Sequence, residues 1–193
     1  CIIYNKNKLK KYNKKIKNKI NINTSITKTL YEGSANKRKK GLHIYTNNNN
    51  QLSSENMNSC FQNYVTDTLV RKELYELARK FGYAVVNHNQ SFPLALIMSG
   101  KPGIGKTHLS VAILNLVLGN SDKSIVYIDE KYIRDYFQCH AKYIDMNEIL
   151  EEKDLIVFDD INSIYGCGPE FFEKAFKYIF ENNKAMLVSS NIS

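Results

Sequence analysis

The sequence has no apolar run of the length that a membrane-spanning helix requires. Its longest runs, such as Leu94 to Met98, fall well short of the ~18 residues needed. It has only four cysteines, far apart and without a C-x-x-C pair, which excludes a disulfide framework and a zinc knuckle and suits a reducing compartment. Tryptophan is absent, yet 13 tyrosines and 9 phenylalanines supply apolar side chains for a core. We therefore expect one cytoplasmic domain with some chain left over and no membrane partner.

Acidic residues are almost absent from residues 1–60. This segment has 13 lysines and arginines against two acids and carries +11, whereas residues 61–193 carry −3. It also holds 13 asparagines and few apolar residues, so it cannot bury enough surface to offset its ordering entropy. We predict a disordered, basic Lys/Asn-rich tail over 1–60 and a folded domain over 61–193. Two other interpretations of the tail stay open: a presequence for a plastid or mitochondrion, and a nucleic-acid-binding arm.

From residue 61 onward, apolar runs alternate with helical patterns. The first helix has Asp67 as its expected N-cap and Gly82 as its expected stop. Continuous apolar runs predict four strands, at Leu94–Ser99, Ser124–Asp129, Asp154–Asp159 and Ala185–Ser190. One further helix is expected to follow the first strand and to end near Gly119-Asn120. Two short helices are expected within residues 130–152, and another helix over Pro169–Glu181. Strands that are apolar on both faces and alternate with helices indicate an α/β fold with a covered parallel sheet.

The sharpest motif is a phosphate-binding loop at Gly100–Thr107, which fits G-x-x-x-x-G-K-[ST]. It follows an apolar strand and opens an amphipathic helix, as such a loop requires. Glycines let the backbone turn its N–H groups toward phosphate oxygens, while Lys106 would reach the β- and γ-phosphates and Thr107 would bind Mg²⁺. The loop residues that we predict to bind a nucleoside triphosphate are Gly100, Gly103, Ile104, Gly105, Lys106, Thr107 and His108.

Polar residues follow two of the other predicted strands. Asp159 and Asp160 end an apolar strand, at the sheet edge where ligands bind in doubly wound folds. We predict that Asp159 holds Mg²⁺, directly or through water, and that Asp160 orients or deprotonates an attacking water. Asn191 ends the last strand. If that strand lies between the other two, Asn191 projects toward the γ-phosphate and polarises the same water.

These motifs together resemble one branch of the AAA+ ATPases. The branch includes the replication initiator DnaA, the helicase loader DnaC and the IstB-type transposition ATPases. The resemblance rests on the phosphate loop Gly105–Leu109, the strand end Asp159–Ile161, the Ser-Asn strand end at Asn191, and the stretch Phe61–Val65. That last stretch is similar to the Phe-x-Asn-Phe-Val box that begins this domain in initiators.

The resemblance implies a P-loop NTPase fold, a three-layer αβα sandwich. Its sheet order is 5-1-4-3-2, and this chain supplies strands 1 to 4. Lys106 and Thr107 take the Walker A positions, Asp159 and Asp160 the Walker B positions, and Asn191 that of sensor 1. Tyr64 and Val65 lie beside the adenine. The implied cofactors are ATP and Mg²⁺. The implied partners are single-stranded DNA, through the helices of 130–152, or a replicative helicase, with self-association through AAA+ interfaces in the full-length protein.

Strand 5, the helical lid, the sensor-2 arginine and the arginine finger of the family would all follow Ser193. We therefore expect a fragment that binds ATP and turns it over slowly, with its first strand an exposed apolar edge. Two alternatives to a replication ATPase stay open. One is a nucleotide kinase, since the phosphate loop also occurs there, and the other is a non-catalytic ATP-binding remnant.

Overall fold

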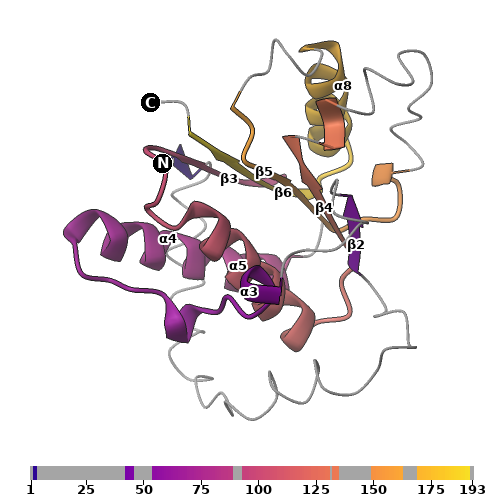
Figure 1. Ribbon diagram of the computed structural model, residues 1–193. Coiled ribbons are helices and arrows are strands. Elements are labelled where there is room, and N and C mark those ends of the chain that lie inside the picture. Colours follow the sequence, from indigo (N-terminus) through magenta and orange to yellow (C-terminus); the bar gives the residue numbers. More distant parts are fainter. Residues whose placement is uncertain are drawn as a thin grey trace.

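A six-stranded sheet forms the centre of the protein (Figure 1). The computed structural model describes residues 2–3, 42–45, 54–88, 93–130, 132–134, 149–162 and 169–191. The strand order is β1-β3-β6-β5-β4-β2, and every neighbouring pair is parallel except β1 with β3. The strands are β1 (Ile2–Ile3), β2 (Leu42–Tyr45), β3 (Leu94–Ser99), β4 (Ile125–Asp129), β5 (Leu155–Asp159) and β6 (Ala185–Ser190). The expected order 1-4-3-2 of the four predicted strands is confirmed, because it corresponds to β3-β6-β5-β4.

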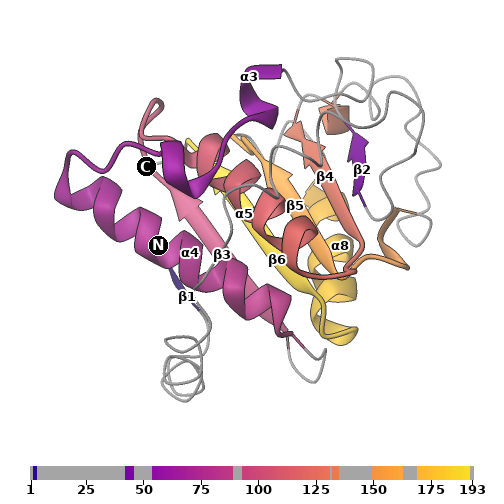
Figure 2. The same ribbon diagram turned by 90° about the horizontal axis from the view of Figure 1, so that it is seen from below.

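Helices cover both faces of the sheet, so the three-layer sandwich is confirmed (Figures 1 and 2). One face carries α4 (Leu69–Val86) and α5 (Lys106–Asn120), and the other carries α8 (Pro169–Glu181). The short helices α3 (Ser54–Met57) and η1 (Phe61–Asn63) lie beside α5. In the part of the chain that the structure describes, none of the helices combines the length and the apolar character needed to cross a membrane.

The two faces of the sheet have separate apolar cores. Alternate residues of β5 divide between them: Val157 packs with α4 and α5, while Phe158 packs with α8. The Phe158 ring meets three phenylalanine rings of α8 edge-on, those of Phe171, Phe172 and Phe176. Both β5 and β6 are buried along their whole length. Burial on both faces explains why these strands read as continuous apolar runs. Because the strands are parallel, their polar carboxyl ends meet at one edge of the sheet.

The helix α4 differs from its prediction at both ends. Thr68, not Asp67, is its N-cap, because the Thr68 hydroxyl accepts a hydrogen bond from the backbone N–H of Arg71. The helix also continues past Gly82 as far as Val86, so the expected stop at Gly82 is wrong. Gly82 is buried against α5, where an added Cβ would lie 2.7 Å from Leu116 Cδ2. This glycine therefore allows close helix packing and does not end the helix.

Parts of residues 1–60 belong to the fold. The strand β2 pairs with β4, with Leu42 opposite Ile125. The stretch after α3 is tied to α5 by the Asn115 side chain, which donates to the carbonyl oxygen of Ser59 at 2.8 Å. The rest of the predicted tail lies outside the described residues, and the domain boundary at residue 61 stays a prediction.

The sheet edge also differs from its prediction. Ile2 and Ile3 pair with Ile97 and Leu96, so β1 and not β3 is the edge strand. The two strands β4 and β5 each begin one residue later than expected. Most of the expected helical stretch 130–152 lies outside the described residues, although residues 130, 132–134 and 149–150 are helical.

Candidate functional site

The predicted phosphate-binding loop connects the end of β3 to the start of α5. Gly103 and Gly105 adopt φ values of +81° and +92°, in the left-handed region that favours glycine. Gly105 is also the N-cap of α5. The loop therefore turns directly into the amino end of a 15-residue helix, where free N–H groups and the helix dipole favour an anion.

Lys106 is buried, with 6% of its surface exposed, and its ammonium group lies inside the loop. Its Nζ donates to the carbonyl oxygens of Gly100 at 2.8 Å and Lys101 at 2.9 Å. Burial lowers the pKa of Lys106, while the nearby charges of Asp160 and Asp159 act to raise it. The structure thus brings Lys106 into electrostatic range of both predicted Walker B carboxylates.

Asp159 lies at the carboxyl end of β5 and is 2% exposed. Both of its carboxylate oxygens accept hydrogen bonds: one from the Tyr127 hydroxyl at 2.7 Å, the other from Ser189 Oγ at 2.6 Å. Burial, reinforced by the Asp159 charge, raises the pKa of Tyr127 well above its usual value, so its hydroxyl remains a donor. Two donors from the neighbouring strands β4 and β6 therefore fix the orientation of this carboxylate. Sequence reasoning missed both of them.

Asp160 and Asn191 meet beside the Asp159 carboxylate. The Asn191 side-chain amide donates to the Asp160 carboxylate, and the Asp160 backbone N–H donates to Ser189 Oγ at 2.8 Å. Asp160 has a φ of 58°, a left-handed conformation that aspartate tolerates better than most residues. This turn directs the second carboxylate of the pair toward the last strand. The two residues that we predicted to act on water are thus hydrogen-bonded to each other.

A second buried carboxylate, Glu130, supports the same edge of the sheet and was not predicted. It follows β4 directly, is 4% exposed, and accepts hydrogen bonds from the Asn162 backbone N–H and from the Arg134 guanidinium. The Asn162 side chain in turn accepts from the backbone N–H of Asn191 at 2.8 Å. The only sequence signal for Glu130 is that it is an acidic residue immediately after a buried strand, the same pattern that identified Asp159.

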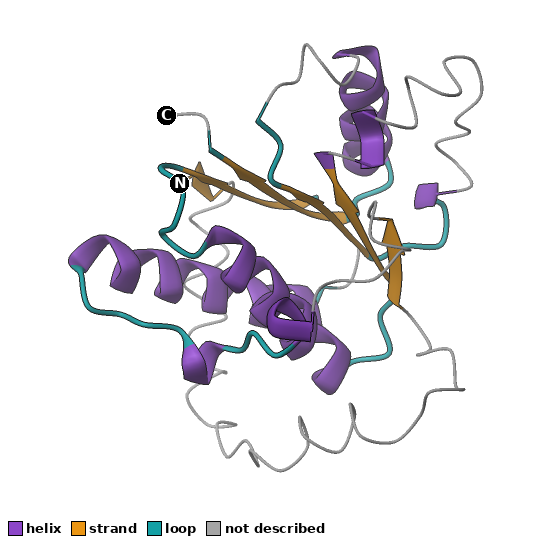
Figure 3. Ribbon diagram, viewed as in Figure 1, coloured by secondary structure: helices purple, strands orange, loops and turns teal. Residues whose placement is uncertain are grey.

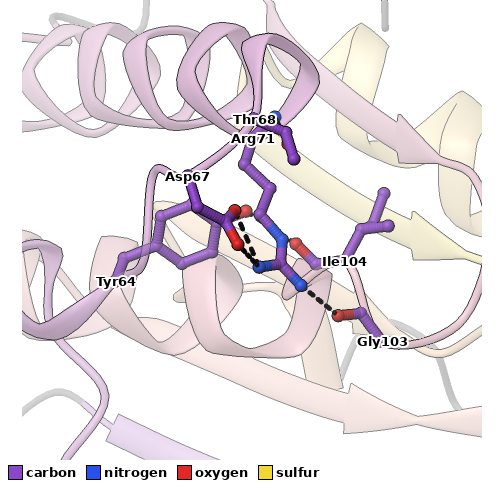
Figure 4. A network of polar contacts seen from close by, with 6 residues as sticks. All are labelled: Tyr64, Asp67, Thr68, Arg71, Gly103 and Ile104. Carbon is purple, nitrogen blue, oxygen red and sulfur yellow. Dashed lines mark hydrogen bonds and ion pairs between the residues drawn. The ribbon is translucent and has the colours of Figure 1, made fainter.

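Of the remaining predicted residues, Tyr64 contacts the phosphate loop directly (Figure 4). The Tyr64 hydroxyl donates to the carbonyl oxygen of Ile104 at 2.6 Å. Val65 is 60% exposed, and His108 Nε2 lies 3.0 Å from the carbonyl oxygen of Cys60, so the His108 ring is engaged outside the loop. Thr107 is half-buried in the first turn of α5. Within the described ranges, no group of three or more His, Cys, Asp or Glu side chains gathers in a way that could hold a metal ion.

Comparison with known proteins assigns this arrangement to a family. The model of the bacterial DnaA ATPase domain matches residues 60–193, which include every residue of the site. The chain belongs to the bacterial DnaA ATPase domain family. The predicted membership of the AAA+ initiator and loader branch is thereby confirmed.

Individual proteins agree with this DnaA-type assignment. The chromosomal replication initiator protein DnaA of Geobacter metallireducens is 31% identical over 145 residues, which make up 72% of this chain and 31% of that protein. The chain therefore spans about a third of the length of this relative. The crystal structure of the DnaC helicase loader shares the fold, with a TM-score of 0.60, 21% identity, and coverage of 73% of this chain and 81% of the loader. AMPPCP-bound DnaA from Aquifex aeolicus shares it with a TM-score of 0.56, 19% identity, and coverage of 70% and 42%.

The hydrogen bond from Tyr127 to Asp159 gives a first prediction. Replacing Tyr127 with phenylalanine removes one of the two donors to Asp159 and leaves a buried carboxylate oxygen unpaired. We expect the free energy of unfolding to fall by about 1.5–3 kcal/mol, measured by urea unfolding. Tyr178→Phe on the α8 face is the matched control and should change it by less than about 0.5 kcal/mol. Equal stability of Tyr127→Phe and the unchanged protein would contradict the assigned hydrogen bond.

Proposed function

We propose that this chain is the ATP-binding core of a DNA-replication ATPase of the initiator type. In this proposal it binds ATP and Mg²⁺ and couples hydrolysis to assembly on DNA. The observation that carries the proposal is the meeting of three segments in a chain of the DnaA ATPase family: Asn191 is bonded to Asp160, Ser189 to Asp159, and the loop that holds Lys106 is bonded through Gly100 to Ser190. The nucleotide analogue in the related Aquifex aeolicus DnaA supports the choice of ligand.

The loop and its lysine would bind the triphosphate. The N–H groups of the loop and of the first turn of α5 are suited to phosphate oxygens, and Lys106 supplies the positive charge for the β- and γ-phosphates. Lys106 Nζ donates hydrogen bonds to two carbonyl oxygens of the loop. Its ammonium therefore already lies within the loop that would receive the phosphates. Tyr64 and Val65 would lie on the adenine side.

Thr107 and Asp159 would hold Mg²⁺. One carboxylate and one hydroxyl fit this ion, which usually takes one or two protein groups together with substrate phosphates and water. The fixed orientation of Asp159, imposed by Tyr127 and Ser189, fits a residue that must present a lone pair in one direction. When bound, Mg²⁺ would neutralise charge on the phosphate oxygens.

Asp160 and Asn191 would act on the attacking water. A carboxylate held by an amide can accept a proton from water while the amide orients the same molecule. The contact between the two side chains supports this division of roles, because it brings the carboxylate and the amide within hydrogen-bond distance of each other. Asp160 is exposed, so water can reach it.

Replacing Asp160 with asparagine tests this role. We expect ATP affinity to stay within about threefold of the unchanged protein, and hydrolysis to slow by about 10²–10⁴-fold, because the general base is lost while the phosphate loop is intact. Single-turnover hydrolysis and fluorescence titration with labelled ATP measure the two quantities. Asp122→Asn, at an exposed position, is the control for loss of one negative charge.

Three outcomes would change the proposal. Undiminished hydrolysis by Asp160→Asn would remove Asp160 from the mechanism. Tight binding of ATP without hydrolysis, even after addition of single-stranded DNA, would instead favour the non-catalytic remnant. Transfer of the γ-phosphate to a nucleoside monophosphate would favour the kinase.

A helicase loader is the second candidate function. Its support is the Ser-Asn end of β6, which matches loaders, and the shared fold with the DnaC helicase loader over 81% of that chain. The partner would then be a replicative helicase. Sedimentation with ATP, first with single-stranded DNA and then with a hexameric helicase, separates the two candidates and also detects self-association. Residues 131 and 135–148 of the predicted DNA contact lie outside the described residues.

A further inference from the structure

Two consecutive carbonyl groups of the phosphate loop are hydrogen-bonded by side chains that precede β3 in the chain. The Arg71 guanidinium donates to the carbonyl oxygen of Gly103 at 3.2 Å, and the Tyr64 hydroxyl donates to that of Ile104 at 2.6 Å. Tyr64 lies in the segment that leads into α4 and Arg71 lies in the first turn of α4, and both side chains reach the loop (Figure 4). We call Tyr64 and Arg71 the loop clamp.

The clamp determines where the neighbouring N–H groups point. In a trans peptide the carbonyl group and the N–H of the next residue point in opposite directions, and no peptide bond of the described chain is cis. Because the carbonyls of Gly103 and Ile104 face the clamp, the N–H groups of Ile104 and Gly105 face away from it. Such N–H groups are the ones that a phosphate-binding loop uses for an anion.

Both members of the clamp are themselves held in place. Asp67 accepts two hydrogen bonds from the Arg71 guanidinium, at 2.9 and 3.0 Å. The Tyr64 ring packs so closely on the loop that a Cβ added at Gly105 would lie 2.4 Å from Tyr64 Cε2. The centroids of the Tyr64 and His108 rings lie 5.3 Å apart, and the two rings meet edge-on. Burial raises the pKa of Tyr64, which keeps its hydroxyl a donor at neutral pH.

We infer that Tyr64 and Arg71 are positioning residues that preorganise the loop N–H groups for the phosphates of the nucleotide. The inference rests on the proposed function. This role differs from a contact with the adenine. A contact with the base would affect the binding of ligands that carry a base, whereas the clamp affects the binding of any polyphosphate. Preorganised donors lower the entropic cost of binding, because the loop loses little conformational freedom when the phosphates bind.

Two variants and two ligands test the clamp. Tyr64→Phe keeps the ring against Gly105 and removes only the hydroxyl, and Arg71→Ala removes the other donor. Binding of ATP and of inorganic tripolyphosphate, which has no base, is measured by calorimetry. We expect each variant to weaken both ligands to the same extent, by about threefold to tenfold, as for loss of one hydrogen bond. Thermal unfolding confirms that each variant is folded at the temperature of the titration.

Matched controls separate the clamp from charge and from general stability. Lys72→Ala removes the neighbouring exposed cation, and Tyr83→Phe removes a hydroxyl elsewhere on α4. Both should keep the affinities of the unchanged protein. An equal loss in Lys72→Ala would show that Arg71 acts by charge alone and would overturn its part in the clamp.

The outcomes distinguish the clamp from the proposed function itself. If the variants weaken ATP but leave tripolyphosphate unchanged, Tyr64 and Arg71 act on the base and the clamp is refuted. Unchanged affinity for both ligands refutes it as well. If the unchanged protein binds neither ligand, the phosphate site proposed above is wrong, whatever the clamp residues do.

Discussion

Replacement of Lys106 with alanine is expected to lower the affinity for ATP about a hundredfold or more. The ammonium group is the buried cation that the loop offers to the phosphates, and each charge-assisted hydrogen bond that it makes contributes roughly 1.5–3 kcal/mol. Two such bonds correspond to at least two orders of magnitude in Kd. Titration with fluorescent ATP, with and without Mg²⁺, measures the effect.

Lys101 provides the matched control for this substitution. Lys101 belongs to the same loop, but it is exposed, and its hydrogen bond with Lys106 is made by its backbone carbonyl oxygen. Lys101→Ala should therefore change ATP affinity by less than about threefold, the effect of a screened surface charge. If Lys106→Ala binds ATP as tightly as Lys101→Ala, the phosphate loop has been misassigned and the ATPase proposal fails.

Replacement of Gly105 with alanine should disrupt the same loop through its backbone. A side chain at φ +92° costs about 1–2 kcal/mol, and the new Cβ would collide with the Tyr64 ring at 2.4 Å. Displacement of a packed ring adds about 1–3 kcal/mol. We therefore expect the free energy of unfolding to fall by about 2–5 kcal/mol and ATP binding to be lost with the loop geometry.

Replacement of Gly103 with alanine separates the cost of backbone strain from the cost of the collision with the Tyr64 ring. Gly103 has a similar φ of +81°, yet an added Cβ there would have no atom within 4 Å. Gly103→Ala should therefore cost only the backbone strain of about 1–2 kcal/mol. Urea unfolding of both variants gives the difference. Equal destabilisation would show that the Tyr64 ring does not press on the loop.

The strands and their polar ends were predictable because each depends on a local pattern. A run such as Leu155–Phe158 is apolar on both faces, which is typical of a parallel sheet that helices cover on both sides. Polar residues that follow such a run meet at one edge of the sheet. Asp159 and Asn191 were found in this way, and the structure brings them to the same edge.

The positions that were missed depend on contacts between distant segments. Tyr127 reads as one more apolar strand residue, and only the pairing of β4 with β5 brings its hydroxyl to Asp159. Gly82 reads as a helix stop, and only the packing of α4 on α5 shows why a glycine is needed inside the helix. In each case the deciding neighbour lies 30 or more positions away along the chain, beyond the range of any periodic pattern.

The sequence alone determined the α/β class and the positions of the four central strands with their polar ends, because apolar periodicity and glycine spacing are properties of short segments. The order of those strands followed from the family resemblance. Only the tertiary structure decided which groups hold those ends in place. The donors to Asp159 and the loop clamp of Tyr64 and Arg71 arise from strand register and helix packing, which join parts of the chain that carry no mutual signal. Side-chain hydrogen bonds form over about 3 Å, so they exist only after the fold has set those distances.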